Sequence, residues 1–194
     1  MIKIFKNPNG DTRTAPKNVT FEEFQEANDM HIDDVKQVMY ELSQIVDHRG
    51  ENHDCTKKSQ ERMFYNNFLS TMNDGTDFVN DEWYQLHIKA ERHHLLSNCP
   101  DDVNLIDVLE MIADCVCAGM ARSGEIRDLE INPDILNRAV QNTAKLIKDL
   151  IEEYDEKSER FRKRWEERKA AEEKDGNRYR EAYGKLYDKF LKTY

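Results

Sequence analysis

All six histidines of this 194-residue chain fall between His31 and His94, and the dipeptide His53-Asp54 stands among them. Imidazole and carboxylate groups together are typical ligands of zinc and of transition metals, and the ring must be near neutral to bind. The order of these residues predicts a helical metal centre that activates water. The expected metal ligands are His31, His53, Asp54, His87, His93, His94 and Asp114.

Apolar residues recur at helical spacing along most of the chain, which predicts an all-α fold. A short strand at residues 2–5 precedes the helices. Thr20 begins a capping box before a short helix, and Asn28 and Asp29 cap the next one. The further helices are expected at residues 53–69, 83–96, about 102–120, and from 133 onward.

The composition changes after residue 132, so we expect two parts. Residues 1–132 form a metal-binding helical domain that begins with a short segment, 1–19. Residues 133–194 form a long, charged helical extension, which is nearly all charge from 152 to 174. Its apolar residues must be shielded from solvent, either by packing on the first part or by packing on a partner subunit in a homo-oligomer. They are Ile135, Ala139, Leu146, Leu150, Tyr154, Phe161, Trp165, Tyr179, Tyr183 and Phe190.

Charge and cysteine content exclude several classes of protein. A net charge of −10 argues against general nucleic-acid binding, because that affinity comes from neutralising phosphates. The four cysteines include no Cys-x-x-Cys pair, which argues against a zinc ribbon. Residues 1–6 are too short and too charged for a signal peptide, and no apolar run is long enough to span a membrane. We therefore expect a cytoplasmic protein.

Several choices among the polar residues stay open from the sequence. His93 and His94 point about 100° apart on a helix, so we expect one of them to bind metal, and His94 shares a face with His87. Asp107 is an alternative ligand to Asp114. Glu110 is expected to orient a histidine ligand by contacting the ring nitrogen that does not face the metal. His48 is expected at the surface.

Lys57 and Glu61 are four residues apart. They form either an ordinary ion pair on a helix surface or part of the site, with Lys57 facing a substrate phosphate.

The order His31, His53-Asp54 and Asp114 resembles the HD-domain superfamily of metal-dependent phosphohydrolases. The resemblance implies an HD-like helical bundle in which these residues hold a divalent metal. Members often carry a lysine three residues after the Asp, as Lys57 does here. Two-metal variants add histidines for a second ion, and the Asp then bridges both. The implied cofactor is one or two ions of Mn, Fe, Co, Ni, Zn or Mg.

The chain more closely resembles a small group of uncharacterised HD-like proteins, several of them from phages. If a phage encodes this chain, the expected location is the host cytoplasm. The resemblance rests on Lys57-x3-Glu61-x3-Tyr65, on the segment from His87 to His94, and on residues 110–114. It covers about residues 31–120. Those proteins usually have Trp after the last Asp, where this chain has Cys115.

These resemblances imply a phosphohydrolase that acts on a nucleotide or a related phosphate ester through metal-activated water. The expected catalytic residues are Asp54, Lys57 and Glu61. One alternative is an HD-type di-iron oxygenase. Another is a helical interaction protein, not an enzyme, with a structural or vestigial metal site.

Overall fold

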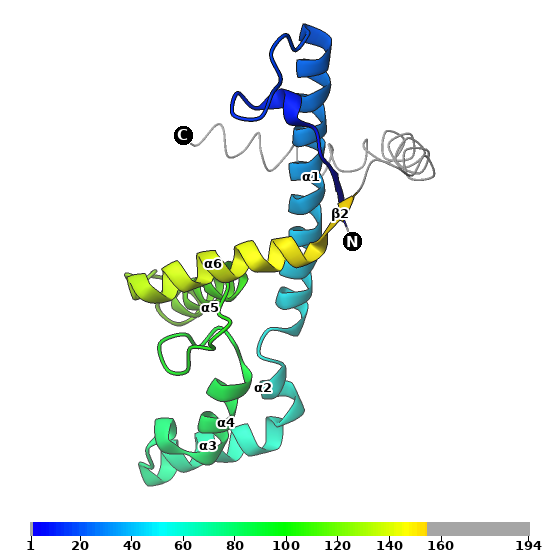
Figure 1. The fold of residues 1–194 in the computed structure, drawn as a ribbon. Coiled ribbons are helices and arrows are strands. Elements are labelled where there is room, and N and C mark those ends of the chain that lie inside the picture. Colours follow the sequence, from blue (N-terminus) through cyan, green and yellow to red (C-terminus); the bar gives the residue numbers. More distant parts are fainter. Residues whose placement is uncertain (1, 155–194) are drawn as a thin grey trace.

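Helix α1 (Phe21–Asn52) is the longest element of the computed structural model, which describes residues 2–154 (Figure 1). It begins with the predicted capping box. The Glu23 amide donates to the Thr20 hydroxyl at 3.2 Å, and the Thr20 amide donates to the Glu23 carboxylate at 2.9 Å. The predicted helix start at Asn28 and Asp29 is wrong, since both lie inside α1. Such residues cost a helix interior only a few tenths of a kcal/mol, and the apolar spacing continues on both sides.

Helices dominate the described residues, as the all-α prediction requires, and a small strand pair joins them. The remaining elements are β1 (Ile2–Phe5), the 3-10 turn η1 (Pro8–Gly10), α2 (Cys55–Ser59), α3 (Glu61–Asp74), the 3-10 turn η2 (Phe78–Asn80), α4 (Glu82–Ala90), α5 (Leu105–Ser123), α6 (Pro133–Leu150) and β2 (Ile151–Tyr154). Within residues 2–154, no helix is both long and apolar enough to cross a membrane.

The predicted strand β1 is present, and its partner β2 was not predicted. The two strands pair in parallel with Ile2 opposite Ile151 (Figure 1). We expected the helix from residue 133 to continue through Tyr154, but α6 ends at Leu150. The next four residues instead satisfy the backbone groups of β1, a pairing that no local sequence pattern announces.

Two predicted helices are interrupted earlier than expected. The predicted helix 53–69 is divided into α2 and α3 at Gln60, whose φ of −121° leaves the helical region. Helix α4 ends at Ala90 instead of Leu96, and Glu91 is extended. The Glu91 carboxylate accepts hydrogen bonds from the amide and the hydroxyl of Thr56, at 2.9 and 2.6 Å. This contact fixes the extended residue at the end of α4, and a turn follows it.

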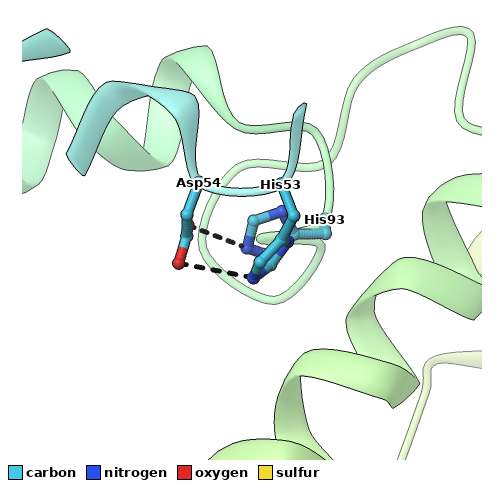
Figure 2. A group of neighbouring side chains, drawn as sticks. All are labelled: His53, Asp54 and His93. Carbon is cyan, nitrogen blue, oxygen red and sulfur yellow. Dashed lines mark ion pairs between the residues drawn. The ribbon is translucent and has the colours of Figure 1, made fainter. Parts of the chain in front are cut away.

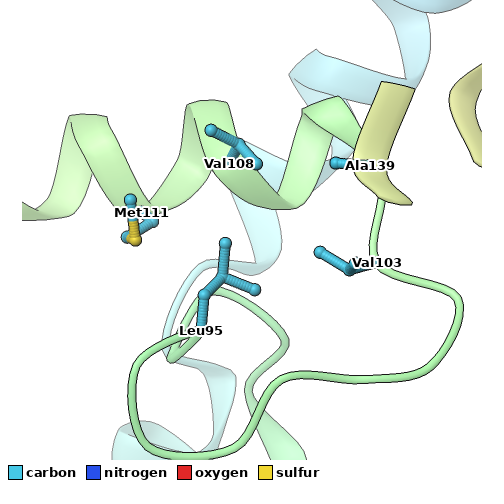
Figure 3. Close-up of a cluster of buried hydrophobic side chains, with 5 residues drawn as sticks. All are labelled: Leu95, Val103, Val108, Met111 and Ala139. Atoms are coloured by element: carbon cyan, nitrogen blue, oxygen red, sulfur yellow. The ribbon is translucent and has the colours of Figure 1, made fainter. Parts of the chain in front are cut away.

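The main apolar core lies directly behind that turn (Figure 3). Leu95 comes from the turn, and Val108 and Met111 come from α5. Ala139 of α6 closes the cluster and is fully buried, as is Val103 just before α5. The core therefore joins the turn after α4 to α5 and α6, and so it anchors the segment that follows His93 and His94.

The expectations for the far end of the chain cannot be compared with the structure. The predicted charged helix from 152 to 174 lies almost wholly outside the described residues, and the amphipathic helix around Tyr179–Phe190 lies entirely outside them.

Candidate metal centre

The His53-Asp54 dipeptide forms the sharp junction between α1 and α2. His53 ends α1 in an extended conformation, with φ −53° and ψ 132°. Asp54 follows with φ +54°, a left-handed conformation that costs a residue with a Cβ atom about 1–2 kcal/mol. An unusual backbone of this kind is found most often at functional sites. Here it turns the chain so that both side chains face the same space.

Asp54 forms a first group with His53 and His93 (Figure 2). Its Oδ2 lies 3.4 Å from His53 Nε2, and its Oδ1 lies 3.6 Å from His93 Nε2. Asp114 on α5 borders this group, with its Oδ1 3.5 Å from His53 Nε2. The predicted convergence of His53, Asp54 and Asp114 is therefore present.

Asp54 also belongs to a second group, with His87 and His94. Its Oδ1 lies 3.5 Å from His87 Nε2, and the Nε2 atoms of His87 and His94 are 2.8 Å apart. The predicted pairing of His87 with His94 is correct, but a turn produces it, not one helix. Because the turn also brings in His93, each of the two neighbouring histidines belongs to one group.

Hydrogen bonds outside the groups fix the direction of two imidazole rings. Glu110 accepts from His53 Nδ1 at 3.1 Å, which is the contact expected for Glu110. The Thr56 hydroxyl gives its one proton to Glu91, so it accepts from His87 Nδ1, at 2.7 Å. Both rings therefore carry the proton on Nδ1 when neutral and present the Nε2 lone pair to the group.

The sequence interpretation missed Thr56 and Glu91 as supports of His87. Thr56 follows Asp54 by two residues, and Glu91 follows His87 by four. Only the second spacing is a local signal, because residues four apart share a helix face. The contact between them joins α2 to the end of α4 and is visible only in three dimensions.

Two buried polar atoms in the centre indicate that these residues fit a metal ion. Asp54 Oδ1 and His93 Nε2 have no hydrogen-bond partner among the described residues, and the His93 residue is only 2% exposed. Leaving such atoms unpaired is costly, and coordination would satisfy both. The donor set of four imidazoles with Asp54 and Asp114 suits zinc or a first-row transition metal better than calcium.

The protonation of the histidines differs between the two groups. Burial, followed by the nearby His93 and His87, lowers the pKa of His94 to about 4. Burial also lowers the pKa of His87. Burial alone would lower the pKa of His93 too, but its contact with Glu110 outweighs this and raises it. Metal binding requires neutral rings, so the second group is ready at neutral pH.

His31 lies far from this centre, so the expectation that it joins the other ligands is wrong. It is exposed on α1, and the uninterrupted helix places it about 30 Å from His53 at 1.5 Å per residue. His93 occupies the position beside Asp54 and His53 that we had expected for His31. His48 is exposed on α1, as predicted, and contacts Asn52.

Asp34, one turn after His31, has an unusual pKa of its own. Burial is the main cause that raises it to about 6, and the nearby charge of His31 opposes the shift. The folded state therefore binds a proton more tightly than the unfolded state, and stability is lost as pH rises through about 6. We expect Asp34→Asn to gain stability relative to the natural chain as pH rises from about 4 to about 7. Urea unfolding at several pH values measures this difference, and a constant difference would contradict the assignment.

Asp107 is not a ligand of the centre, so the alternative to Asp114 is wrong. It is fully buried, and its carboxylate accepts bonds from Arg49 at 3.0 Å and from Arg92 at 2.8 and 2.9 Å. Arg49 also reaches Glu110 at 3.4 Å. Asp107 thus ties the end of α1 and the turn after α4 to the start of α5.

Lys57 faces the centre, whereas Glu61 does not. The Lys57 ammonium contacts Asp54 Oδ2. Burial alone would raise the pKa of Asp54, but the hydrogen bond and charge of Lys57 lower it. Glu61 is exposed at the start of α3, and the described residues include no ion pair between it and Lys57. Of the two alternatives for Lys57, the surface ion pair with Glu61 is therefore absent.

The sequence was also compared with known proteins. The profile of a protein family described as a family of unknown function (DUF5662) matches residues 20–157. No curated protein and no solved structure matches the chain. The matched range includes both His/Asp groups and the residues that orient them. Because it also spans most of the 194 residues, the chain belongs to DUF5662.

Proposed function

We propose that this protein is a metal-dependent phosphohydrolase of the HD type, acting on a nucleotide or a related phosphate ester. The observation that carries the proposal is the position of Asp54 in two adjacent His/Asp groups. The first group would hold one divalent ion through His53, Asp54 and His93, with Asp114 beside it. The second would hold another through Asp54, His87 and His94.

The protein's own residues divide the work at this site. Glu110 and Thr56 hold the rings of His53 and His87 with Nε2 inward. Lys57 is part-exposed at the rim and supplies a positive charge that suits a phosphoryl oxygen. When bound, a divalent ion would lower the pKa of water and stabilise negative charge on the phosphate. Exposed Glu61 has no part in this scheme.

A metal-dependent phosphatase assay tests the proposal. The purified chain would be loaded with Mn²⁺, Co²⁺, Ni²⁺ or Mg²⁺, and release of phosphate would be followed over a panel of nucleotides. We expect turnover with at least one metal and loss of turnover in Asp54→Asn. Metal binding without phosphate release would reject the hydrolase. Oxygen consumption by the iron-loaded chain would then support the oxygenase, and its absence would support a structural metal site.

Lys57→Ala should reduce turnover by about 100-fold, the lower part of the range for loss of a residue that stabilises transition-state charge. Metal content should fall much less, because an ammonium cannot coordinate a cation. The matched control is Lys58→Ala, which removes the exposed neighbouring lysine. Turnover and metal content are measured on the same samples. If both fell equally, the only role of Lys57 would be to hold Asp54 in place.

A further inference from the structure

Helix α1 carries a row of apolar side chains with the spacing of a coiled-coil seam. We name this row the α1 stripe. Its members are Ile32, Val35, Met39, Leu42 and Val46. They follow one another at intervals of three, four, three and four residues, the repeat with which helices pack side by side. The stripe extends along about four turns of α1.

The α1 stripe is open to solvent in the described part of the chain. Met39 is 60% exposed, and Ile32, Val35 and Val46 are exposed as well. The described elements that chiefly contact α1 are β1, η1 and α5, and these four side chains remain exposed beside them. Scattered apolar residues are common on surfaces, but a continuous row in heptad spacing indicates a binding surface.

The charge of α1 argues against a second α1 as the partner. The helix carries nine acidic and two basic residues. Two such helices side by side would bring like charges together, which costs binding free energy. The surface therefore fits a basic amphipathic segment.

The chain itself contains such a segment at its carboxy terminus. Residues 178–194 include five basic and two acidic residues. Tyr179, Tyr183, Leu186 and Phe190 follow one another at intervals of four, three and four, which matches the α1 stripe. We propose that residues 178–194 bind the α1 stripe of the same chain as an amphipathic helix. This inference does not depend on the proposed enzymatic activity.

The path of the chain permits this contact. Strand β2 ends at Tyr154 and pairs with β1, which itself contacts α1 (Figure 1). The 23 residues from 155 to 177 would span about 35 Å as a helix and at most about 80 Å when extended. Helix α1 is about 48 Å long, so every part of the α1 stripe is within reach.

Limited trypsin digestion of the full chain tests the proposal, because the segment offers several Lys and Arg cleavage sites. Met39→Glu places a charge in the α1 stripe and should speed cleavage within residues 178–194 by about tenfold, since proteolysis follows the undocked population. Met72→Glu on α3 is the matched control, because Met72 is 66% exposed and lies off the stripe. It should leave the rate unchanged, and Tyr183→Glu should reproduce the effect of Met39→Glu.

Circular dichroism would verify that Met39→Glu keeps its helix content. Equal cleavage rates in the natural chain, Met39→Glu and Met72→Glu would overturn the proposal. A second copy of the chain would replace the proposed occupant under one combined result. Protection of residues 178–194 from trypsin would disappear on dilution, and light scattering would give a particle of twice 23.0 kDa. Protection that is independent of concentration and falls as salt rises from about 50 to about 500 mM would support the proposal.

Discussion

Asp54→Asn should abolish metal binding at both His/Asp groups while the helical fold persists. Asp54 is the residue that the two groups share, so one substitution removes the charged oxygen from both. Asparagine tolerates the left-handed backbone that Asp54 adopts, and it has nearly the same size. We expect metal affinity to fall by more than about 100-fold, the upper end of the loss caused by removing a residue that only supports a ligand.

Isothermal titration with Zn²⁺ or Co²⁺ measures this loss, and circular dichroism follows the fold. Asp128→Asn is the control, because it removes an exposed carboxylate between α5 and α6. If Asp54→Asn bound two ions with undiminished affinity, Asp54 would not be a ligand. If it bound one ion normally, Asp54 would belong to a single group.

Asp107→Ala should be the most destabilising single substitution that we predict. Asp107 is 0% exposed, and its removal leaves Arg49 and Arg92 without their shared carboxylate. Breaking a buried ion pair in this way costs about 3–5 kcal/mol, and the partial exposure of the arginines favours the lower value. A loss of about 3 kcal/mol corresponds to a fall in Tm of about 6–12 °C in a protein of this size.

Thermal unfolding compares Asp107→Ala with Asp102→Ala. Asp102 also pairs with Arg92, at 2.9 Å, but its side chain is 77% exposed. Because exposed ion pairs contribute at most about 1 kcal/mol, the control should lose little stability. Equal falls in Tm would mean that the buried position of Asp107 adds nothing to the pair.

The sequence predicted those parts of the fold and of the centre that depend on local spacing. The capping box at Thr20 is such a case, since it requires only a hydroxyl and a carboxylate three residues apart. Glu110 and Asp114 are four apart on α5, which places both toward His53. The His53-Asp54 pair stood out because two adjacent polar residues rarely face inward without a ligand.

The sequence could not predict the features that contacts between distant segments determine. His31 was placed in the centre because it precedes His53-Asp54 in the order typical of such a site, but the continuous α1 carries His31 away from it. His93 was placed on a helix because nothing in residues 83–96 stops one. Local periodicity would have continued α4 beyond Ala90, but the hydrogen bond between Glu91 and Thr56 fixes the chain where the helix ends.

The pairing of β1 with β2 also determines when the first residues of the chain can reach their final place. Residues opposite each other, such as Ile2 and Ile151, are separated by almost the whole described sequence. Pairing over so long a separation closes a large loop, and contacts of this kind form slowly. On a ribosome that adds 5–20 residues per second, Ile151 is made roughly 7 to 30 s after Ile2. Strand β1 is thus synthesised long before its partner, and it is among the last elements to be completed.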